Sequence, residues 1–379
     1  MPRIIVITIV IVTGIFMMSI YATAQDKYEK RANPDNYDIP VMKAITYGLI
    51  APSPHNSQSW FIDPISDTEM LLFVKHLLPE TDPPARQIHI GAGCFIELVS
   101  IGMSKEGFKT NVEYFPQGEY ELKPFEIAEK PVAKITLIKD KTIKKDVLYD
   151  YIYQRGTNRR PYKGKMITSE EFVQMKSFMG PYRSEMIFIA GKSLMKPYLD
   201  IFSKSMEIET RTKATNEETR QMFRFSEKER AEKRDGISIP QMGYSGMTEK
   251  IAENSLNNGD SITWHSEKIF KATMRGINKG IYSSKGIIIF KTKTNTPLNW
   301  VLSGRDYARY NIAIAKMGIV THPYNQVIQE YPEMENLRKQ FNTMLDISGD
   351  EKIQMIVRIG RAKSTYKSWR KNPEDYIMK

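Results

Sequence analysis

Two stretches that end close to a glycine decide the fold of this chain. They are RQIHIGAGCFIELVSIGM at residues 86–103 and SGRDYARYNIAIAKM at residues 303–317. The first is apolar nearly all round, with Glu97 as its lone acid, and it stops before Gly107, which predicts a buried helix. The second stops at Gly318, and we predict a helix there as well. The core is therefore expected to form around these two helices.

The two helices belong to an order of elements that occurs twice. Gly93 to Gly107 and Gly304 to Gly318 have the same separation. A strand-like run follows each helix, and two helix starts and two strands precede them. In the first copy the helix start, the strand and the later strand-like run are residues 41–45, 70–74 and 132–138. In the second copy they are residues 147–153, 287–290 and 353–359. The repeated order predicts one duplicated unit, with copies at residues 41–140 and 145–363 that pack face to face.

The second copy is longer because it carries an insertion, which we place at about residues 194–280. The insertion is highly charged: residues 207–211 and 217–234 are typical of exposed helices, and a Gly/Ser/Asn-rich stretch follows at residues 236–259. A segment of this length between two strands is expected to lie over the core. It is either a lid over an active site or a solvated helical decoration.

Residues 1–24 form a separate segment. Arg3 precedes an uncharged apolar run at residues 4–21, and Ala22-Thr23-Ala24 supplies the small-x-small pattern that signal peptidase accepts. The segment predicts a secretory signal and a protein exported to the periplasm or cell envelope. The apolar run is about as long as a minimal membrane span, so an uncleaved N-terminal anchor is the competing interpretation. Membrane contact is expected only through this segment.

Composition excludes several classes of protein. The chain has 379 residues, 41% of them hydrophobic and 26% charged, which is typical of a globular protein. With Cys94 as the single cysteine and no HExxH pattern, we expect neither a disulfide nor a metal site, and no GxxxxGK[ST] loop is present. The formal charge of +11 favours anionic partners, but no nucleic-acid recognition motif accompanies it. A basic envelope protein that binds anionic partners on its insertion is one alternative.

Two polar loops from different copies carry groups suited to a nucleotide ligand. The loop at residues 52–60 holds the side-chain amides of Asn56 and Gln58, which donate and accept hydrogen bonds at once and suit a planar heterocycle. The loop at residues 155–160, RGTNRR, combines three guanidinium groups with a hydroxyl, and arginine matches phosphate best. Together they predict a mononucleotide site; separately, each is equally consistent with an ordinary turn or a solvated basic face.

Arg358 lies inside the apolar run at residues 353–359. A charge in such a run is costly without a partner. We therefore expect an anion beside Arg358, either a carboxylate or a ligand phosphate.

The two loops resemble motifs of a known family. Residues 51–60, APSPHNSQSW, resemble the A-P-S-x-x-N-x-Q-P-W signature of the FMN-dependent nitroreductases, and residues 155–162, RGTNRRPY, resemble the R-x-[ST]-x-R phosphate segment of that family. The combination is most similar to its Acg-like, single-chain tandem branch, in which R-x-T-N-R-R, a late helix end like Gly318-Ile319 and a final R-x-G run like Arg358-Ile359-Gly360 recur. The likeness covers most of residues 41–363.

The resemblance implies an α+β nitroreductase-like fold, with the two copies as an intramolecular pseudo-dimer and the insertion as a helical lid. Ordinary members are homodimers that combine phosphate-binding arginines of one subunit with the P-S-x-x-N loop of the other. Here only the first copy keeps that loop and only the second keeps the arginines, so a monomer with one FMN is implied. The implied cofactor-binding residues are Pro52, Ser53, Asn56, Gln58, Arg155, Thr157, Asn158, Arg159, Gly318, Arg358 and Arg361.

The implied activity is an FMN-dependent oxidoreductase. Electrons would pass from NAD(P)H through the flavin to a nitroaromatic, quinone or similar acceptor, and no side chain is needed as a catalytic group because the chemistry belongs to the flavin. The alternative is a protein that sequesters or stores FMN without turnover. The size of the insertion and the lack of an identifiable nicotinamide site favour this alternative.

Overall fold

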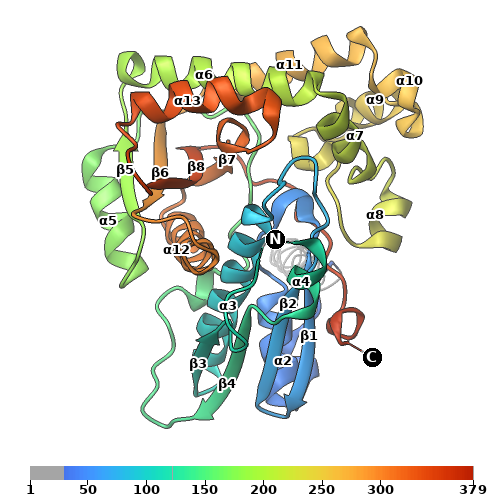
Figure 1. Cartoon of the computed structure of the whole chain (residues 1–379). Helices are drawn as coiled ribbons and strands as arrows, with labels where there is room; N and C mark the ends of the chain where they lie inside the picture. Colours follow the sequence, from blue (N-terminus) through green and yellow to red (C-terminus); the bar gives the residue numbers. More distant parts are fainter. Residues whose placement is uncertain (1–29, 122, 379) are drawn as a thin grey trace, which may run out of the picture.

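The computed structural model describes residues 30–121 and 123–378, an α+β protein with two four-stranded antiparallel sheets (Figure 1). The predicted signal segment, residues 1–24, lies outside these residues. The first sheet has the order β1-β2-β4-β3 and the second has the order β5-β6-β8-β7. The strands are β1 (Trp60–Ser66), β2 (Glu69–Val74), β3 (Phe108–Tyr114), β4 (Ala133–Lys139), β5 (Glu185–Ile189), β6 (Gly286–Thr292), β7 (Val320–Pro323) and β8 (Lys352–Gly360). The two sheets therefore have the same strand order, with β5, β6, β7 and β8 in the positions of β1, β2, β3 and β4.

The two long predicted helices are confirmed, and they cross at the centre of the molecule. They are α3 (Arg86–Lys105) and α12 (Pro297–Lys316). A Cβ atom added at Gly93 would lie 1.9 Å from the carbonyl oxygen of Val301, and one added at Gly304 would lie 2.0 Å from that of Ile90. Each glycine thus faces the carbonyl three residues before the other glycine. The two backbones are therefore in direct contact at these two glycines, where no larger residue would fit.

One apolar core surrounds this crossing. It includes Leu72 and Ile135 of the first sheet and Ile288 and Val357 of the second. By length and composition α3 could also span a membrane, but it is buried within the protein, which is typical of a core helix. The remaining α-helices of these layers are α2 (Pro40–Gly48), α4 (Pro124–Glu129), α5 (Ser169–Met179) and α13 (Glu335–Met344).

The insertion lies between β5 and β6, and its helices lie at the upper edge and one side of the molecule (Figure 1). They are α6 (Lys192–Arg211), α7 (Lys213–Gln221), α8 (Glu227–Lys233), α9 (Met247–Ser255), α10 (Ser261–Trp264) and α11 (Glu267–Ile281). The predicted helix at residues 217–234 is interrupted after Gln221, and two of its charged side chains are buried and hydrogen-bonded rather than exposed. Arg230 binds Glu253 at 2.6 Å, and Glu218 accepts the backbone N–H of Thr81 at 2.9 Å.

One predicted helix is wrong. Residues 147–153 form only the 3-10 turn η3 (Tyr149–Tyr151), and α5, directly before β5, takes the position that α2 has before β1. Aromatic residues are weak helix formers, and the Asp146 carboxylate accepts the Leu148 N–H at 2.8 Å, which favours a turn. The other 3-10 helices are η1 (Pro34–Asn36), η2 (Pro54–Asn56), η4 (Ile239–Met242), η5 (Asn257–Gly259), η6 (Gln326–Ile328), η7 (Pro332–Met334) and η8 (Pro373–Tyr376).

Candidate functional site

The amide-rich loop between α2 and β1 has a strained backbone. His55, Asn56 and Gln58 have φ angles of 49°, 55° and 52°. Asparagine tolerates this left-handed region and histidine is also found there more often than most residues, whereas glutamine adopts it at a cost. The Ser53 hydroxyl accepts the N–H of Gln58 at 3.0 Å and so closes the turn. Strain of this kind, held in place by surrounding contacts, is common at functional sites.

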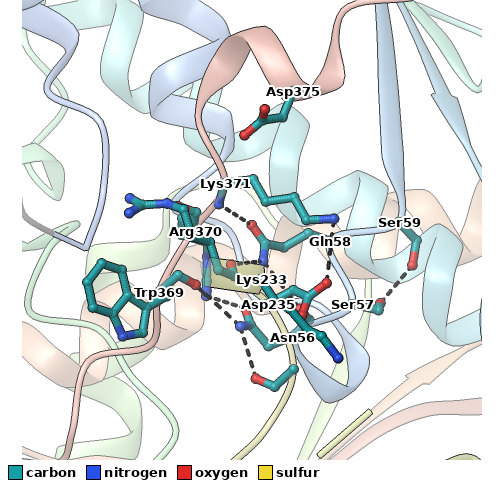
Figure 2. A network of polar contacts seen from close by, with 12 residues as sticks. Asn56, Ser57, Gln58, Ser59, Lys233, Asp235, Trp369, Arg370, Lys371 and Asp375 are labelled. Carbon is teal, nitrogen blue, oxygen red and sulfur yellow. Dashed lines mark hydrogen bonds and ion pairs between the residues drawn. The ribbon is translucent and has the colours of Figure 1, made fainter. Parts of the chain in front are cut away.

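The side chains of Asn56 and Gln58 bind the C-terminal part of the chain, as Figure 2 shows. We call residues 363–372 the strap. Asn56 donates to the carbonyl of Trp369 at 3.3 Å and accepts from the Arg370 guanidinium, while the oxygen of Gln58 accepts the N–H of Lys371 at 3.2 Å. Both amides also donate to carbonyls of the insertion, those of Gly236 and Arg234. The predicted ring-binding amides are thus occupied by protein groups.

The arginine-rich loop lies beside the amide loop. The buried Arg155 donates to the carbonyl of Ile50 at 2.8 Å, and Arg159 donates to the carbonyl of Gln241 in the insertion at 3.5 Å. Thr157 pairs with Thr321 of β7, which fixes the loop against the second sheet. Asn158 donates to the carbonyl of Lys363 at the start of the strap, at 2.8 Å. The core, the insertion and the strap therefore meet at this loop.

A cavity of about 70 Å³ lies where these parts meet. Within the described part of the chain, its lining contains five Arg or Lys residues and no acid. The lining consists of Arg31, Pro52, Ser53, His55, Asn56, Arg155, Gly156, Thr157, Arg159, Ile237, Gln241, Tyr366, Lys367, Ser368 and Arg370. Buried charges are normally paired with opposite charges. A buried, one-signed lining of this kind is suited to an anion.

Burial and neighbouring positive charges lower the pKa values of several groups at the cavity. Burial, followed by the charges of Arg31, Arg155 and Arg370, lowers the pKa of Lys367 to about 7. Burial and the charge of Arg155 lower the pKa of Arg31 to about 10. Burial and then Arg159 lower the pKa of His55 to about 4. A bound anion would favour the charged form of every one of these groups.

Of the residues predicted from the sequence, the structure brings Pro52, Ser53, Asn56, Arg155, Thr157 and Arg159 to the cavity. Gln58 and Asn158 do not line the cavity, and their side chains form hydrogen bonds with Lys371 and Lys363 of the strap. Three others, Gly318, Arg358 and Arg361, lie elsewhere. Gly318 follows the end of α12 with a φ of 67°, and Arg361 pairs with Glu171.

No carboxylate among the described residues pairs with Arg358, although its position predicts an anion. Arg358 stacks 3.8 Å from the Tyr162 ring centre and donates to the carbonyls of Gly280 and Arg160 at 2.9 and 3.0 Å. Neutral acceptors can satisfy a buried guanidinium because its donors form a planar fork.

Sequence reasoning missed Arg31, Lys367 and Arg370. They come from irregular segments before α2 and after β8. The basic run of residues 361–371 was the available signal, but only the tertiary fold brings it to the loops.

No protein-family model matches this sequence. No curated protein matches it either. The solved structures that are similar include a nitroreductase-like family protein from Bacillus cereus, with 11% identity over 60% of this chain and 92% of that one and a TM-score of 0.33. An iodotyrosine deiodinase bound to FMN and 3-iodo-L-tyrosine has 12% identity over 60% and 95%, with a TM-score of 0.32. A nitroreductase with bound FMN from Bacteroides fragilis has 12% identity over 59% and 94%, with a TM-score of 0.32. These similarities to nitroreductase-like FMN-binding proteins are distant, so the function of this chain must be argued from its own residues.

Proposed function

We propose that this chain is an FMN-binding oxidoreductase of the nitroreductase type. NAD(P)H would be the electron donor and a nitroaromatic, a quinone or a similar small molecule the acceptor. When bound, the flavin supplies the redox chemistry, and the protein supplies position and electrostatics. The observation that carries the proposal is the acid-free cationic cavity between the two predicted loops.

The residues at the cavity fit the phosphate end of FMN. Arg155 and Arg159 supply positive charge, and the Thr157 hydroxyl can donate a hydrogen bond to a phosphate oxygen. Arg31 is 6% exposed, and its Nε atom has no partner among the described residues. A buried, unpartnered donor beside other cations is costly unless an anion accepts from it.

The fit for the flavin ring is different. A cavity of about 70 Å³ is well below the roughly 300–1,000 Å³ of most small-molecule sites. The ring therefore needs space that the strap and the insertion now fill. The same closure favours the second candidate function, a protein that sequesters FMN without turnover.

We also propose that the chain is a fused dimer of one unit. The matching strand orders and the mutual approach of Gly93 and Gly304 support two copies related by a pseudo-two-fold axis. The first copy contributes the amide loop and the second contributes the arginine loop, which supports a single site in a monomer.

The test compares FMN with riboflavin, which lacks the phosphate. Arg159→Ala removes a charge-assisted contact worth about 1.5–3 kcal/mol, so FMN affinity should fall roughly tenfold to a hundredfold. Riboflavin should bind weakly and respond little. Fluorescence quenching measures both affinities. Arg275→Ala, an exposed position on α11, is the matched control.

Equal FMN affinity for wild type and Arg159→Ala would refute the site assignment. If FMN binds as expected, anaerobic addition of NADPH separates the two functions. Bleaching of the flavin absorbance supports the oxidoreductase, whereas a flavin that stays oxidised supports sequestration.

A further inference from the structure

Three of the five cations at the cavity come from outside the predicted motifs. Lys367 and Arg370 belong to the strap, and Arg31 belongs to the segment before α2. The strap runs from the second sheet, across the amide loop, to the edge of the first sheet, where η8 lies (Figure 1). Its closed position therefore brings extra positive charge to a place that already holds Arg155 and Arg159.

The contacts of Lys367 and Arg370, the two strap cations at the cavity, are all with neutral acceptors in the described residues, whereas Lys371 pairs with Asp235 at 3.5 Å. Lys367 donates to the carbonyls of Gln154 and Arg155, both at 3.0 Å. Arg370 donates to the carbonyls of Leu49 and Ala51 at 3.0 and 3.2 Å and to the side-chain oxygen of Asn56. Carbonyl dipoles hold the strap in place, but they do not cancel the repulsion between neighbouring cations.

The strap nevertheless packs closely against the rest of the protein. Trp369 is buried, and the Arg234 guanidinium lies 4.9 Å from the centre of its ring. Gln58 accepts from the N–H of Lys371 at 3.2 Å (Figure 2). It also accepts from the Tyr376 hydroxyl at 2.8 Å. The strap is thus firmly packed in this position, and it holds Lys367 and Arg370 at a cavity whose described lining contains no acid.

We propose that the strap closes on a phosphate dianion, with Lys367 and Arg31 among its ligands. The dianion is either inorganic phosphate or the terminal group of a phosphate monoester. This inference deepens the proposed function because it uses the same cavity, but it does not require a flavin. The bound anion holds the strap shut over the amide loop, and its loss frees Asn56 and Gln58.

The size of the cavity agrees with this ligand. About 70 Å³ holds more than one water molecule, since a single water needs roughly 10–15 Å³, yet it does not hold a nucleotide. Phosphate is the anion whose oxygens best use several arginine donors at once.

The experiment measures phosphate binding and strap mobility in the purified protein. Inorganic phosphate is titrated calorimetrically, and hydrogen exchange of residues 363–372 is followed with and without it. Lys367→Gln should weaken phosphate binding by roughly tenfold to a hundredfold and remove the protection of the strap. Lys363→Gln makes the same change at an exposed lysine of the same segment, outside the cavity lining, and should bind like wild type.

Arg31→Gln is a second variant, in case Lys367→Gln fails to fold, and it should also lose phosphate affinity. Equal phosphate affinity in wild type, the cavity variants and Lys363→Gln would overturn the inference. If FMN binds but neither FMN nor inorganic phosphate protects the strap, the inference fails and the proposed function stands. If phosphate binds and protects but FMN does not bind, the inference stands and the proposed function fails.

Discussion

At the scale of single residues, Lys367 should make the stability of the protein depend on pH. Its pKa in the folded protein is about 7, against an ordinary value of 10.5, because it is partly buried and lies near Arg31, Arg155 and Arg370. Between these two pH values the unfolded chain binds one more proton than the folded chain. The free energy of unfolding should therefore rise with pH across this window, at up to about 1.4 kcal/mol per pH unit.

Denaturant unfolding at pH 7, 8 and 9, without phosphate, checks this prediction. Lys367→Gln should have a smaller slope than wild type, and Lys363→Gln should keep the wild-type slope. Parallel slopes for all three proteins would mean that the Lys367 amine is not perturbed. Phosphate at a saturating concentration should flatten the wild-type slope, since a bound dianion restores the charged form.

The sequence predicted one half of the candidate site and not the other. Arg155, Thr157 and Arg159 could be found because a short local pattern carries them. Lys367 and Arg370 could not, because their position depends on the path of an irregular segment after β8. The partners of Asn56 show the same limit: the amide was recognised as a binding group, but only the fold shows that the strap occupies it.

At the scale of elements, the sequence predicted the central strands and missed the edge strands. The predicted runs correspond to β2, β4, β6 and β8, which occupy the middle of the two sheets. Central strands are apolar over most of their length, as in the Ile287 to Phe290 run, so they are conspicuous. The edge strand β3 alternates partly buried and exposed residues, and β7 has only four residues. Such segments differ little from polar loops.

The crossing of α3 and α12 gives a prediction for one glycine pair. Gly93→Ala would drive a methyl group into the Val301 carbonyl, and neither backbone can move without separating the helices. Overpacking of a core costs about 1–3 kcal/mol or occasionally more, and we expect the upper end here. Gly304→Ala should cost a similar amount, because it enters the same contact from the other side.

Gly91→Ala is the matched control on the same helix. Its added methyl group would have only ordinary contacts, the nearest 3.8 Å away at Pro54. Removing a glycine from a helix interior gains about 0.5–1 kcal/mol, so this variant should be neutral or more stable. Urea unfolding measures all three variants. Similar stability of Gly93→Ala and Gly91→Ala would show that the helices are not in backbone contact.

At the scale of the whole molecule, the repeated strand order coexists with strong asymmetry at the site. The insertion occurs only between β5 and β6, and the strap follows only β8. The sequence predicted the repeat and the longer second copy. The sequence could not predict that the insertion and the strap meet over the amide loop. These segments are far apart in the chain, and no common sequence pattern marks their contact.

This asymmetry predicts the stoichiometry. A second, pseudo-symmetric site would need an arginine loop before α2, but residues 32–39 contain no arginine, and Arg31 already lines the cavity described above. The second site would also need a second strap. We therefore expect one FMN per chain, a monomer by light scattering, and a single phosphate site whose occupation competes with FMN. Flavin released by denaturation and measured against protein concentration gives the ratio. Two flavins per chain would require a second phosphate site and would reject the single site. One flavin per two chains would mean that the site is completed between molecules and would reject the fused dimer.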